Sequence, residues 1–372
     1  MRDLGRRVAL VSNFAPSELG GVSIHSTNIA ERLEDLGYEV ARVQLLQTFD
    51  EGDYVAVGKN PARLVAAVRR FVGRGFKLWH IHSSRRAYHV YPLVPLLRAL
   101  GCEVVLSFHA GMGYSTYLQS HPWRVRLNRV LFGYVARILL MNAAEAQRIR
   151  ELFPRHAERV TSLSPFIAKR YALTETRVGA TRPFTIVTIG SYARQYSMEH
   201  VAEAVAAEPR LRDYDIHVVV VAAHAYRDAD YERELDELPG RAWPTNMRVS
   251  VRKNVADIYP VLEGADLFVR ASRDDSYGLC VAEALQVGTP AIATDVCTRA
   301  RGTITYPYGD LRALGSAILE VVERGERPRR NLLHDQEDSF HQILQVYLET
   351  GLSPADVQSR RTAAFDIQRD PR

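Results

Sequence analysis

The sequence predicts an α/β protein with two doubly wound domains, and three observations lead to this fold class. Short apolar runs alternate with stretches of helical periodicity, which is typical of buried parallel strands joined by helices. This alternation stops in the polar segment 164–183 and then begins a second time. The length of 372 residues is also that of two domains.

The two series of strands lie on either side of the polar segment. Apolar runs in the first series predict strands at 8–13, 40–46, 78–82, 104–108 and 138–141, with a helix at 24–36. The second series predicts strands at 184–189, 216–222, 247–251, 267–270 and 291–294, and a last helix at 339–348. Parallel sheets bind ligands beyond the carboxyl ends of their strands, so two facing sheets predict a ligand-binding cleft between the domains.

The composition is that of a soluble protein, because 47% of the residues are apolar and 24% are charged. No apolar run is long enough to span a bilayer, and the charged first residues lack the pattern of a signal peptide. We therefore expect a cytoplasmic protein. The net charge of +5 favours anionic ligands but is too small to indicate nucleic acid. Three scattered cysteines, Cys102, Cys280 and Cys297, predict neither a disulfide framework nor a metal site.

A first motif, Gly20-Gly21-Val22-Ser23-Ile24-His25, lies between the first predicted strand and its helix. Paired glycines let the backbone approach a ligand closely, and the free N–H groups of a helix N-terminus attract phosphate. An ordinary strand-to-helix turn would give the same pattern.

A second motif spans residues 274–285, after the predicted strand 267–270. Asp275 lies on the loop, helical spacing begins near Gly278, and Glu283 follows one to two turns later. The helix start offers N–H groups to a diphosphate, whereas the carboxylates are better partners for sugar hydroxyls. The alternative is an aspartate at a helix N-terminus and a surface glutamate without a ligand.

Together these motifs resemble the retaining GT-B glycosyltransferases of family 4, also called glycosyl transferases group 1. The matching segments are, in chain order, Gly20-Gly21-Val22 with His25, Trp79-His80-Ile81-His82, Ser107-Phe108-His109, Ala271-Ser272 through Glu283, and Val287-Gly288-Thr289-Pro290. The resemblance covers nearly the whole chain. It implies two Rossmann-like domains that face each other across the cleft.

The predicted division of the chain has five parts. They are an N-terminal acceptor-binding domain at 1–166, a linker at 167–183, a nucleotide-sugar-binding domain at 184–337, a helix at 338–352 that returns to the first domain, and a loosely ordered tail at 353–372.

The resemblance also implies an activity. The chain would move a sugar from a nucleotide-sugar, with UDP-sugar favoured and GDP-sugar next, to a hydroxyl of a glycan, a lipid-linked or a small-molecule acceptor. No metal or other cofactor would be required, because a helix dipole and a cationic side chain would stabilise the leaving diphosphate. Two alternatives remain open: a non-catalytic relative that binds a nucleotide-sugar or a partner protein, and a nucleotide-sugar epimerase.

Site residues follow from the resemblance position by position. His109 and Asp275 take catalytic positions beside the donor sugar, and Glu283 takes the position that binds the nucleotide ribose. The other donor-binding positions fall on Gly20, Gly21, Gly190, Arg194, Ser276, Tyr277, Gly278, Leu279 and Cys280, and the acceptor-binding positions fall on His25 and His82.

Three departures separate this chain from the family pattern. Asp275 stands where a glutamate is usual, and Ala271 replaces a proline. The segment 190–197 lacks both basic residues that normally neutralise the diphosphate. Arg194 lies displaced within this segment, and we expect its long side chain to reach the phosphates.

Two further patterns have ordinary explanations beside functional ones. His80 and His82 lie on one face of a predicted strand, and His89 follows, but no third ligand is well placed. A strand-end role is therefore favoured over a metal site. Basic stretches at 60–77 and 123–129 predict helix faces that are either solvated or in peripheral contact with an anionic membrane.

Overall fold

The computed structural model of the chain describes residues 3–12, 21–45, 54–57, 60–83, 90–109, 113–167, 183–325, 332–333 and 336–354. Gly20 and His89, most of the predicted linker (168–182) and most of the predicted tail (355–372) lie outside the described residues. Within the described part, the strands form two separate sheets.

The first sheet contains seven parallel strands in the order β3-β2-β1-β4-β5-β6-β7. Their bounds are β1 Arg7–Ser12, β2 Glu39–Gln44, β3 Tyr54–Ala56, β4 Leu78–Ser83, β5 Glu103–Phe108, β6 Arg137–Leu140 and β7 Val160–Ser162. The order reverses between β1 and β4. This is the switch point at which open α/β sheets place their ligands.

The second sheet contains six parallel strands in the order β10-β9-β8-β11-β12-β13. Their bounds are β8 Phe184–Tyr192, β9 Ile216–Arg227, β10 Met247–Lys253, β11 Leu267–Arg270, β12 Ala291–Thr294 and β13 Ile304–Tyr306. Its switch point lies between β8 and β11. The predicted fold class is therefore confirmed, with one doubly wound sheet in each half of the chain.

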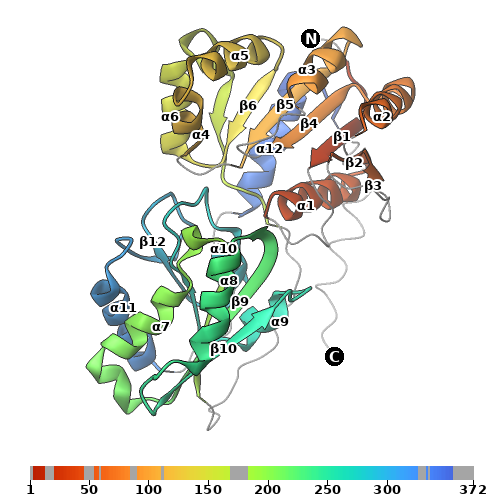
Figure 1. Cartoon of the computed structure of the whole chain (residues 1–372). Helices are drawn as coiled ribbons and strands as arrows, with labels where there is room; N and C mark the ends of the chain where they lie inside the picture. Colours follow the sequence, from red (N-terminus) through yellow and green to blue (C-terminus); the bar gives the residue numbers. More distant parts are fainter. Residues whose placement is uncertain are drawn as a thin grey trace, which may run out of the picture.

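Helices cover both faces of each sheet (Figure 1). In the first half they are α1 Gly21–Asp35, α2 Pro61–Gly73, α3 Val90–Ala99, α4 Gly113–Gln119, α5 Pro122–Gly133 and α6 Ala143–Leu152. In the second half they are α7 Glu199–Ala207, α8 Ala229–Glu237, α9 Tyr259–Gly264, α10 Leu279–Gln286 and α11 Leu311–Glu323, and the final helix is α12 Gln336–Thr350.

The strands missed by the sequence analysis are β3, β7 and β13, each three residues long. All three lie at an edge of their sheet, where a strand pairs on one side only. A segment this short does not produce an apolar run long enough to stand out. The strands with longer apolar runs were all predicted, to within a few residues at their ends.

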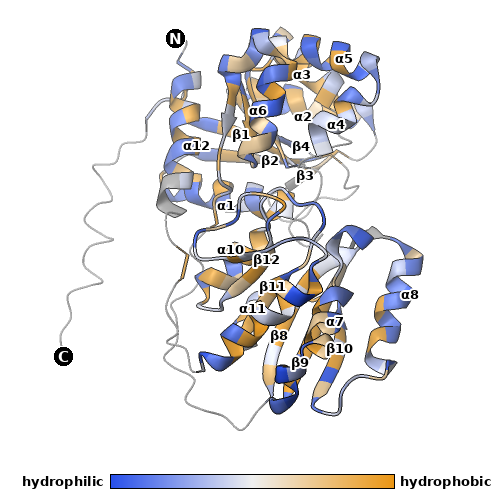
Figure 2. Ribbon diagram, turned by 90° about the vertical axis from the view of Figure 1, so that its left-hand side faces the viewer, coloured by the Kyte–Doolittle hydropathy of each residue, from blue (hydrophilic) through white to orange (hydrophobic). Residues whose placement is uncertain are grey.

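Alternating side chains of the first sheet enter two different cores. Trp79 and Ile81 point to one face and pack with α2, α3, α5 and α6, whereas Leu78 points to the other and packs with α1 and α12. The second sheet is buried in the same way between α7, α8 and α11 on one face and α9 and α10 on the other. Figure 2 shows the apolar strands enclosed by these helices.

The final helix belongs to the core of the first domain, although the second domain precedes it in sequence (Figure 1). Phe340, Ile343 and Tyr347 of α12 pack in the same cluster as strand residues Val8 and Leu78. Backbone hydrogen bonds also join the two ends of the described chain: Leu4 N–H donates to Gly351 O, and Ser353 N–H donates to Gly5 O. The first domain is therefore built from two separate parts of the chain. Most of its residues precede the second domain, and its last helix, α12, follows the second domain.

Candidate active site at the domain junction

The N-termini of two helices, one from each domain, meet where the domains join (Figure 2). Helix α1 begins at Gly21 and helix α10 begins at Leu279. A methyl group on Gly21 would lie only 3.0 Å from Cδ1 of Leu279. Neither helix has an acidic residue in its first turn, so two positive dipole ends converge on this junction. Such an arrangement favours an anion.

The loop before α10 is built around a buried carboxylate. Oδ2 of Asp275 accepts hydrogen bonds from Arg270 Nε at 2.9 Å and Arg299 Nη1 at 2.9 Å, and Ser272 Oγ is 3.1 Å away. Oδ1 accepts the backbone N–H of Ser276 at 3.0 Å. Burial by itself would raise the pKa of Asp275, but the two guanidinium groups outweigh it and hold the pKa well below the usual range. Asp275 is therefore ionised at neutral pH.

Arg299 holds the loop in the shape that starts α10. Besides Asp275, its guanidinium donates to the carbonyl oxygens of Tyr277 (3.0 Å) and Thr294 (2.9 Å). Gly278 caps the helix in the left-handed region, at φ +80°, and a Cβ there would lie 2.6 Å from Arg299 Nη1. Only glycine fits both this backbone and this neighbour.

Glu283 lies in the second turn of α10 and is only 1% exposed. Burial and the nearby Glu283 charge raise the pKa of the Cys280 thiol to about 12, which keeps that thiol protonated. The surface location allowed as an alternative in the sequence analysis is thus wrong for Glu283, because the helix turns this carboxylate inward.

The segment after β8 differs from what its sequence predicts. Arg194 forms a two-pronged ion pair with Glu234 of α8, at 2.8 Å and 2.5 Å, and its side chain is 51% exposed. The cation that occupies this region instead is Arg270, at the end of β11. Its guanidinium lies 4.4 Å above the Tyr196 ring and donates to Ile189 O at 2.6 Å, next to Gly190.

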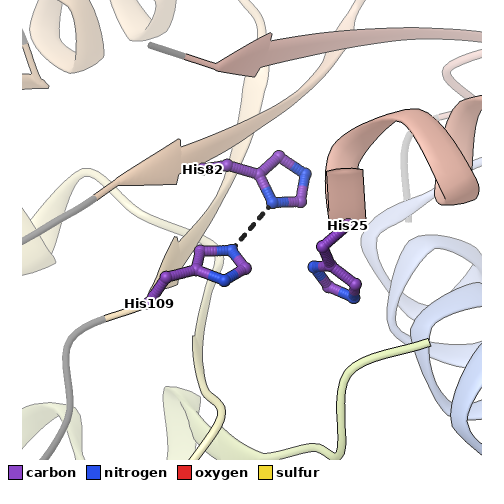
Figure 3. A group of neighbouring side chains, drawn as sticks. All are labelled: His25, His82 and His109. Atoms are coloured by element: carbon purple, nitrogen blue, oxygen red, sulfur yellow. Dashed lines mark hydrogen bonds between the residues drawn. The ribbon is translucent and has the colours of Figure 1, made fainter. Parts of the chain in front are cut away.

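Three histidines from separate elements meet on the first domain's side of the junction (Figure 3). His25 comes from the second turn of α1, His82 from β4, and His109 from the residue after β5. Nδ1 of His82 and Nε2 of His109 are 3.0 Å apart. The His25 ring centroid lies 5.6 Å from that of His82 and 5.1 Å from that of His109.

A fourth histidine, His80, supports this group from behind. Its Nδ1 lies 2.5 Å from the Tyr347 hydroxyl of α12, and its Nε2 lies 2.6 Å from Ser107 Oγ. Its ring centroid is 4.0 Å from that of His82. His80 and His82 thus lie on one face of the strand, as the two-residue alternation predicts.

Burial keeps these imidazoles neutral. It lowers the pKa of His109 to about 4 and that of His80 to about 3, and the pKa values of His25 and His82 lie well below the usual 6.5. Neighbouring histidines lower the pKa of all but His109 further. In the described part of the chain, both ring nitrogens of His25 and Nε2 of His82 are buried with no hydrogen-bond partner. Buried polar atoms without partners are uncommon and often mark a ligand position.

The chain was compared with known proteins by sequence and by structure. Residues 183–324 match the family model for glycosyl transferases group 1. A search of curated protein sequences found no match. Among solved structures, the chain is similar to sucrose-phosphate synthase from Thermosynechococcus elongatus, with a TM-score of 0.70 and 16% identity over 92% of this chain and 98% of that chain.

Two further structures are similar over the same extent. HepE from Anabaena, in complex with UDP, has a TM-score of 0.66 and 13% identity, covering 92% of this chain and 100% of that chain. A glycosyltransferase from Rickettsia africae has a TM-score of 0.62 and 15% identity, covering 93% and 95%. The fold is GT-B. At these identities the similarity shows the fold alone.

The GT-B arrangement brings most of the predicted site residues to one junction, although Gly20 is outside the described residues. Gly21, the start of α10 and the histidine group lie around it, whereas the Arg194 side chain is bound to α8. Sequence reasoning missed Arg270 and Arg299. Their signal was weak: each is one arginine close to the end of an apolar strand, beside the acidic loop.

None of the helices among the described residues is both long enough and apolar enough to cross a membrane.

Proposed function

We propose that this chain is a retaining glycosyltransferase that takes a sugar from a UDP-sugar, with GDP-sugar as the next choice of donor. The observation that carries the proposal is the meeting of two helix N-termini at Gly21 and Leu279, because it creates an anion site shared by both domains. The family match over residues 183–324 includes the α10 side of this site. The HepE structures, which share the fold, contain UDP and UDP-glucose.

In this proposal the diphosphate binds the backbone N–H groups at Gly278, Leu279 and Cys280. The bond to the leaving nucleotide breaks as negative charge builds on the diphosphate, and preorganised dipoles stabilise that charge without reorganisation. Arg270 supplies the positive charge that the segment 190–197 lacks. Its guanidinium is held in place by Asp275, Ile189 O and the Tyr196 ring, so it is preorganised to face the diphosphate. The proposed transfer requires no metal ion.

The carboxylates have separate tasks. Glu283 accepts hydrogen bonds from the ribose hydroxyls. Oδ1 of Asp275 accepts a hydrogen bond from a hydroxyl of the donor sugar. This oxygen already accepts one from the backbone N–H of Ser276, and it has a lone pair for a second donor. Oδ2 remains bound to Arg270 and Arg299, so Asp275 also positions the cation that faces the diphosphate.

The histidine group faces the acceptor. Neutral imidazoles donate or accept hydrogen bonds with hydroxyl groups, and His25, His82 and His109 offer such nitrogens to a glycan, a lipid-linked or a small-molecule acceptor. We assign His109 the position beside the reacting sugar, because it is the only one of the three residues that is not fully buried. The donor phosphate takes the acceptor's proton on the face from which it leaves, and the anomeric configuration is retained.

Nucleotide binding tests the donor site directly. We expect calorimetry to show selective binding of UDP over GDP and ADP. Glu283→Ala should weaken UDP binding by at least about 1 kcal/mol, because a hydrogen bond to a charged group contributes about 1.5–3 kcal/mol. Glu237→Ala, an exposed glutamate at the end of α8, is the control that should bind UDP normally. Failure of all three nucleotides to bind would contradict the proposal. UDP binding without turnover of any UDP-sugar would favour the non-catalytic alternative.

We also propose peripheral contact with an anionic membrane through α5. Among the described residues, five large apolar side chains are exposed, and four of them lie on α5 or directly after it: Trp123 (50% exposed), Leu127, Val130 and Tyr134. Arg126 and Arg129 are exposed beside them. A stripe that combines apolar and cationic side chains is typical of helices that lie on a membrane surface.

Vesicle binding tests this surface. Wild-type protein should bind vesicles containing phosphatidylglycerol and lose binding at high salt, and Trp123→Ala with Leu127→Ala should lower the bound fraction at least about tenfold. Tyr308→Ala, which removes the remaining exposed large apolar side chain, should bind normally. Equal binding of the double variant, or no preference for anionic vesicles, would contradict the membrane proposal.

A further inference from the structure

The three histidines at the junction surround a common point. When three imidazoles bind one metal ion tetrahedrally with metal–nitrogen bonds of 2.0–2.1 Å, their ring centroids are about 5 Å apart. The observed separations are 5.1 Å between His25 and His109, 5.3 Å between His82 and His109, and 5.6 Å between His25 and His82. One nitrogen from each ring lies within 4.8 Å of the other two. Small ring rotations would therefore close the group around an ion.

The unpartnered atoms in this group point to a ligand. His25 is fully buried, and neither of its ring nitrogens has a hydrogen-bond partner in the described part of the chain. Leaving buried polar atoms unsatisfied costs about 1–3 kcal/mol each. His80, in contrast, has both nitrogens bonded, to Tyr347 and Ser107, and is not available as a ligand. In the described part of the chain, the unpartnered buried nitrogens of this group are thus both nitrogens of His25 and Nε2 of His82. Nδ1 of His82 and Nε2 of His109 are bonded to each other, and an entering ion would replace that hydrogen bond (Figure 3).

We propose that His25, His82 and His109 form a binding site for one transition-metal ion of the Zn²⁺ class. Imidazole ligands are typical of Zn²⁺, Cu²⁺ and Ni²⁺, whereas Mg²⁺ and Ca²⁺ prefer oxygen. Three protein ligands leave a fourth coordination position for water or another oxygen ligand. We expect the ion to reach the site past His109, the one residue of the three that is not fully buried.

The site has a consequence for the proposed transferase, and this consequence rests on the proposed function. The same nitrogens face the acceptor in that proposal, so an ion bound to them removes the hydrogen bonds that would hold the acceptor hydroxyl. Transfer itself uses no metal, since the cation and dipoles at the diphosphate lie on the other domain. Zn²⁺ is therefore an inhibitor that competes with the acceptor and leaves UDP binding intact.

Direct binding of the metal tests the site without any assay of activity. Protein without a histidine tag, treated with EDTA and desalted, should bind one Zn²⁺ per chain in calorimetry, and Co²⁺ should give the visible absorption of tetrahedral coordination. His25→Gln and His109→Gln should each weaken Zn²⁺ binding at least about tenfold. His341→Gln, which changes an exposed histidine of α12, should bind as the wild type does.

The outcomes separate the inference from the proposed function. No Zn²⁺ binding, or binding unchanged in both His25→Gln and His109→Gln with native circular dichroism, would overturn the metal site. UDP binding measured with and without Zn²⁺ should give one affinity; if UDP fails to bind at all, the proposed function falls while the metal site stands. Zn²⁺ that binds but leaves the KM for the acceptor unchanged would overturn the competition.

Discussion

Each side of the domain junction contains a buried set of ionisable side chains, but the side chains are neutral on one side and charged on the other. On the first domain, histidines face other histidines, and burial leaves them all neutral. On the second domain, Asp275 lies between Arg270 and Arg299, and all three side chains stay charged. Burial disfavours charge in both places. What differs is whether an opposite charge is within bonding distance.

This difference in charge state suits the two sides to different ligands. A neutral imidazole can both donate and accept, and it adapts to hydroxyl groups or to a metal ion. A fixed ion pair cannot change its role, but it holds a guanidinium and a helix N-terminus in place for a diphosphate. Three experiments would sharpen or break this comparison.

The largest expected effect is on the charged side. Arg299→Ala removes one partner of a buried ion pair and leaves the carbonyls of Tyr277 and Thr294 without their donor. We expect the free energy of unfolding of the second domain to fall by about 3–5 kcal/mol, as measured by urea denaturation. Arg241→Ala breaks an exposed pair with Glu203 and should cost less than about 1 kcal/mol. A similar small loss for both variants would mean that Arg299 is not a structural ion-pair partner.

The neutral side should respond to acid where the charged side does not. A histidine whose pKa is lower in the folded protein stabilises the fold above pH 6.5, and this stability is lost as the pH falls toward the folded pKa, because the unfolded chain takes up the proton first. For His80, with a pKa of about 3, the loss between pH 6.5 and pH 5 is about 2 kcal/mol. Asp275 stays ionised throughout, so it adds no loss in this range.

Peptide-resolved hydrogen exchange with EDTA present can measure this acid response for each domain. Protection of β4 and α12 should fall on going from pH 7 to pH 5, after correction for intrinsic exchange, while protection of β11 and α10 should not. The His80→Gln variant should show a smaller fall than the wild type. Equal behaviour of the two domains would contradict the comparison.

The smallest expected effect is on UDP affinity, and it distinguishes Arg270 from Arg194. Arg270→Gln should weaken UDP binding at least about tenfold, or about 1.4 kcal/mol, because it removes the cation that the proposal places at the diphosphate. Arg194→Gln should leave UDP affinity within about twofold, since its guanidinium is bound to Glu234. Calorimetry of UDP binding to both variants shows which arginine contributes to UDP affinity. The reverse order would restore Arg194 to the role that its sequence position predicts.

The fold could be predicted from the sequence because its determinants are local. Buried parallel strands require continuous apolar runs, and 104–108 or 216–222 show them directly. The short edge strands at Tyr54–Ala56 and Ile304–Tyr306 depend on their single neighbouring strand and carry no such run.

The site could be predicted only in part. The motifs placed Gly21, Glu283 and the histidines on the elements that bear them. The partners of Asp275 could not be read from the sequence, because Arg299 lies 24 residues away and meets it only through the order of β11 and β12. His25 likewise meets His82 and His109 only when α1 packs on the face of the sheet that carries Val8 and Leu78. The ion pair of Arg194 with Glu234 could not be read from the sequence for the same reason, since Glu234 belongs to a later helix.

The position of α12 affects how this protein is made. The hydrogen bond between His80 and Tyr347 joins residues 267 positions apart. The sheet face formed by Val8, Leu78 and Val105 is fully covered only after α12 has been synthesised. A ribosome adding 5–20 residues per second needs about ten to forty seconds to go from β7 to the end of α12. Throughout that time only α1 covers this face of the first domain, and the positions that Phe340, Ile343 and Tyr347 fill stay open. A chain that ends before α12 would keep that apolar surface exposed, and we expect chaperones and proteases to act on it more readily than on the finished protein.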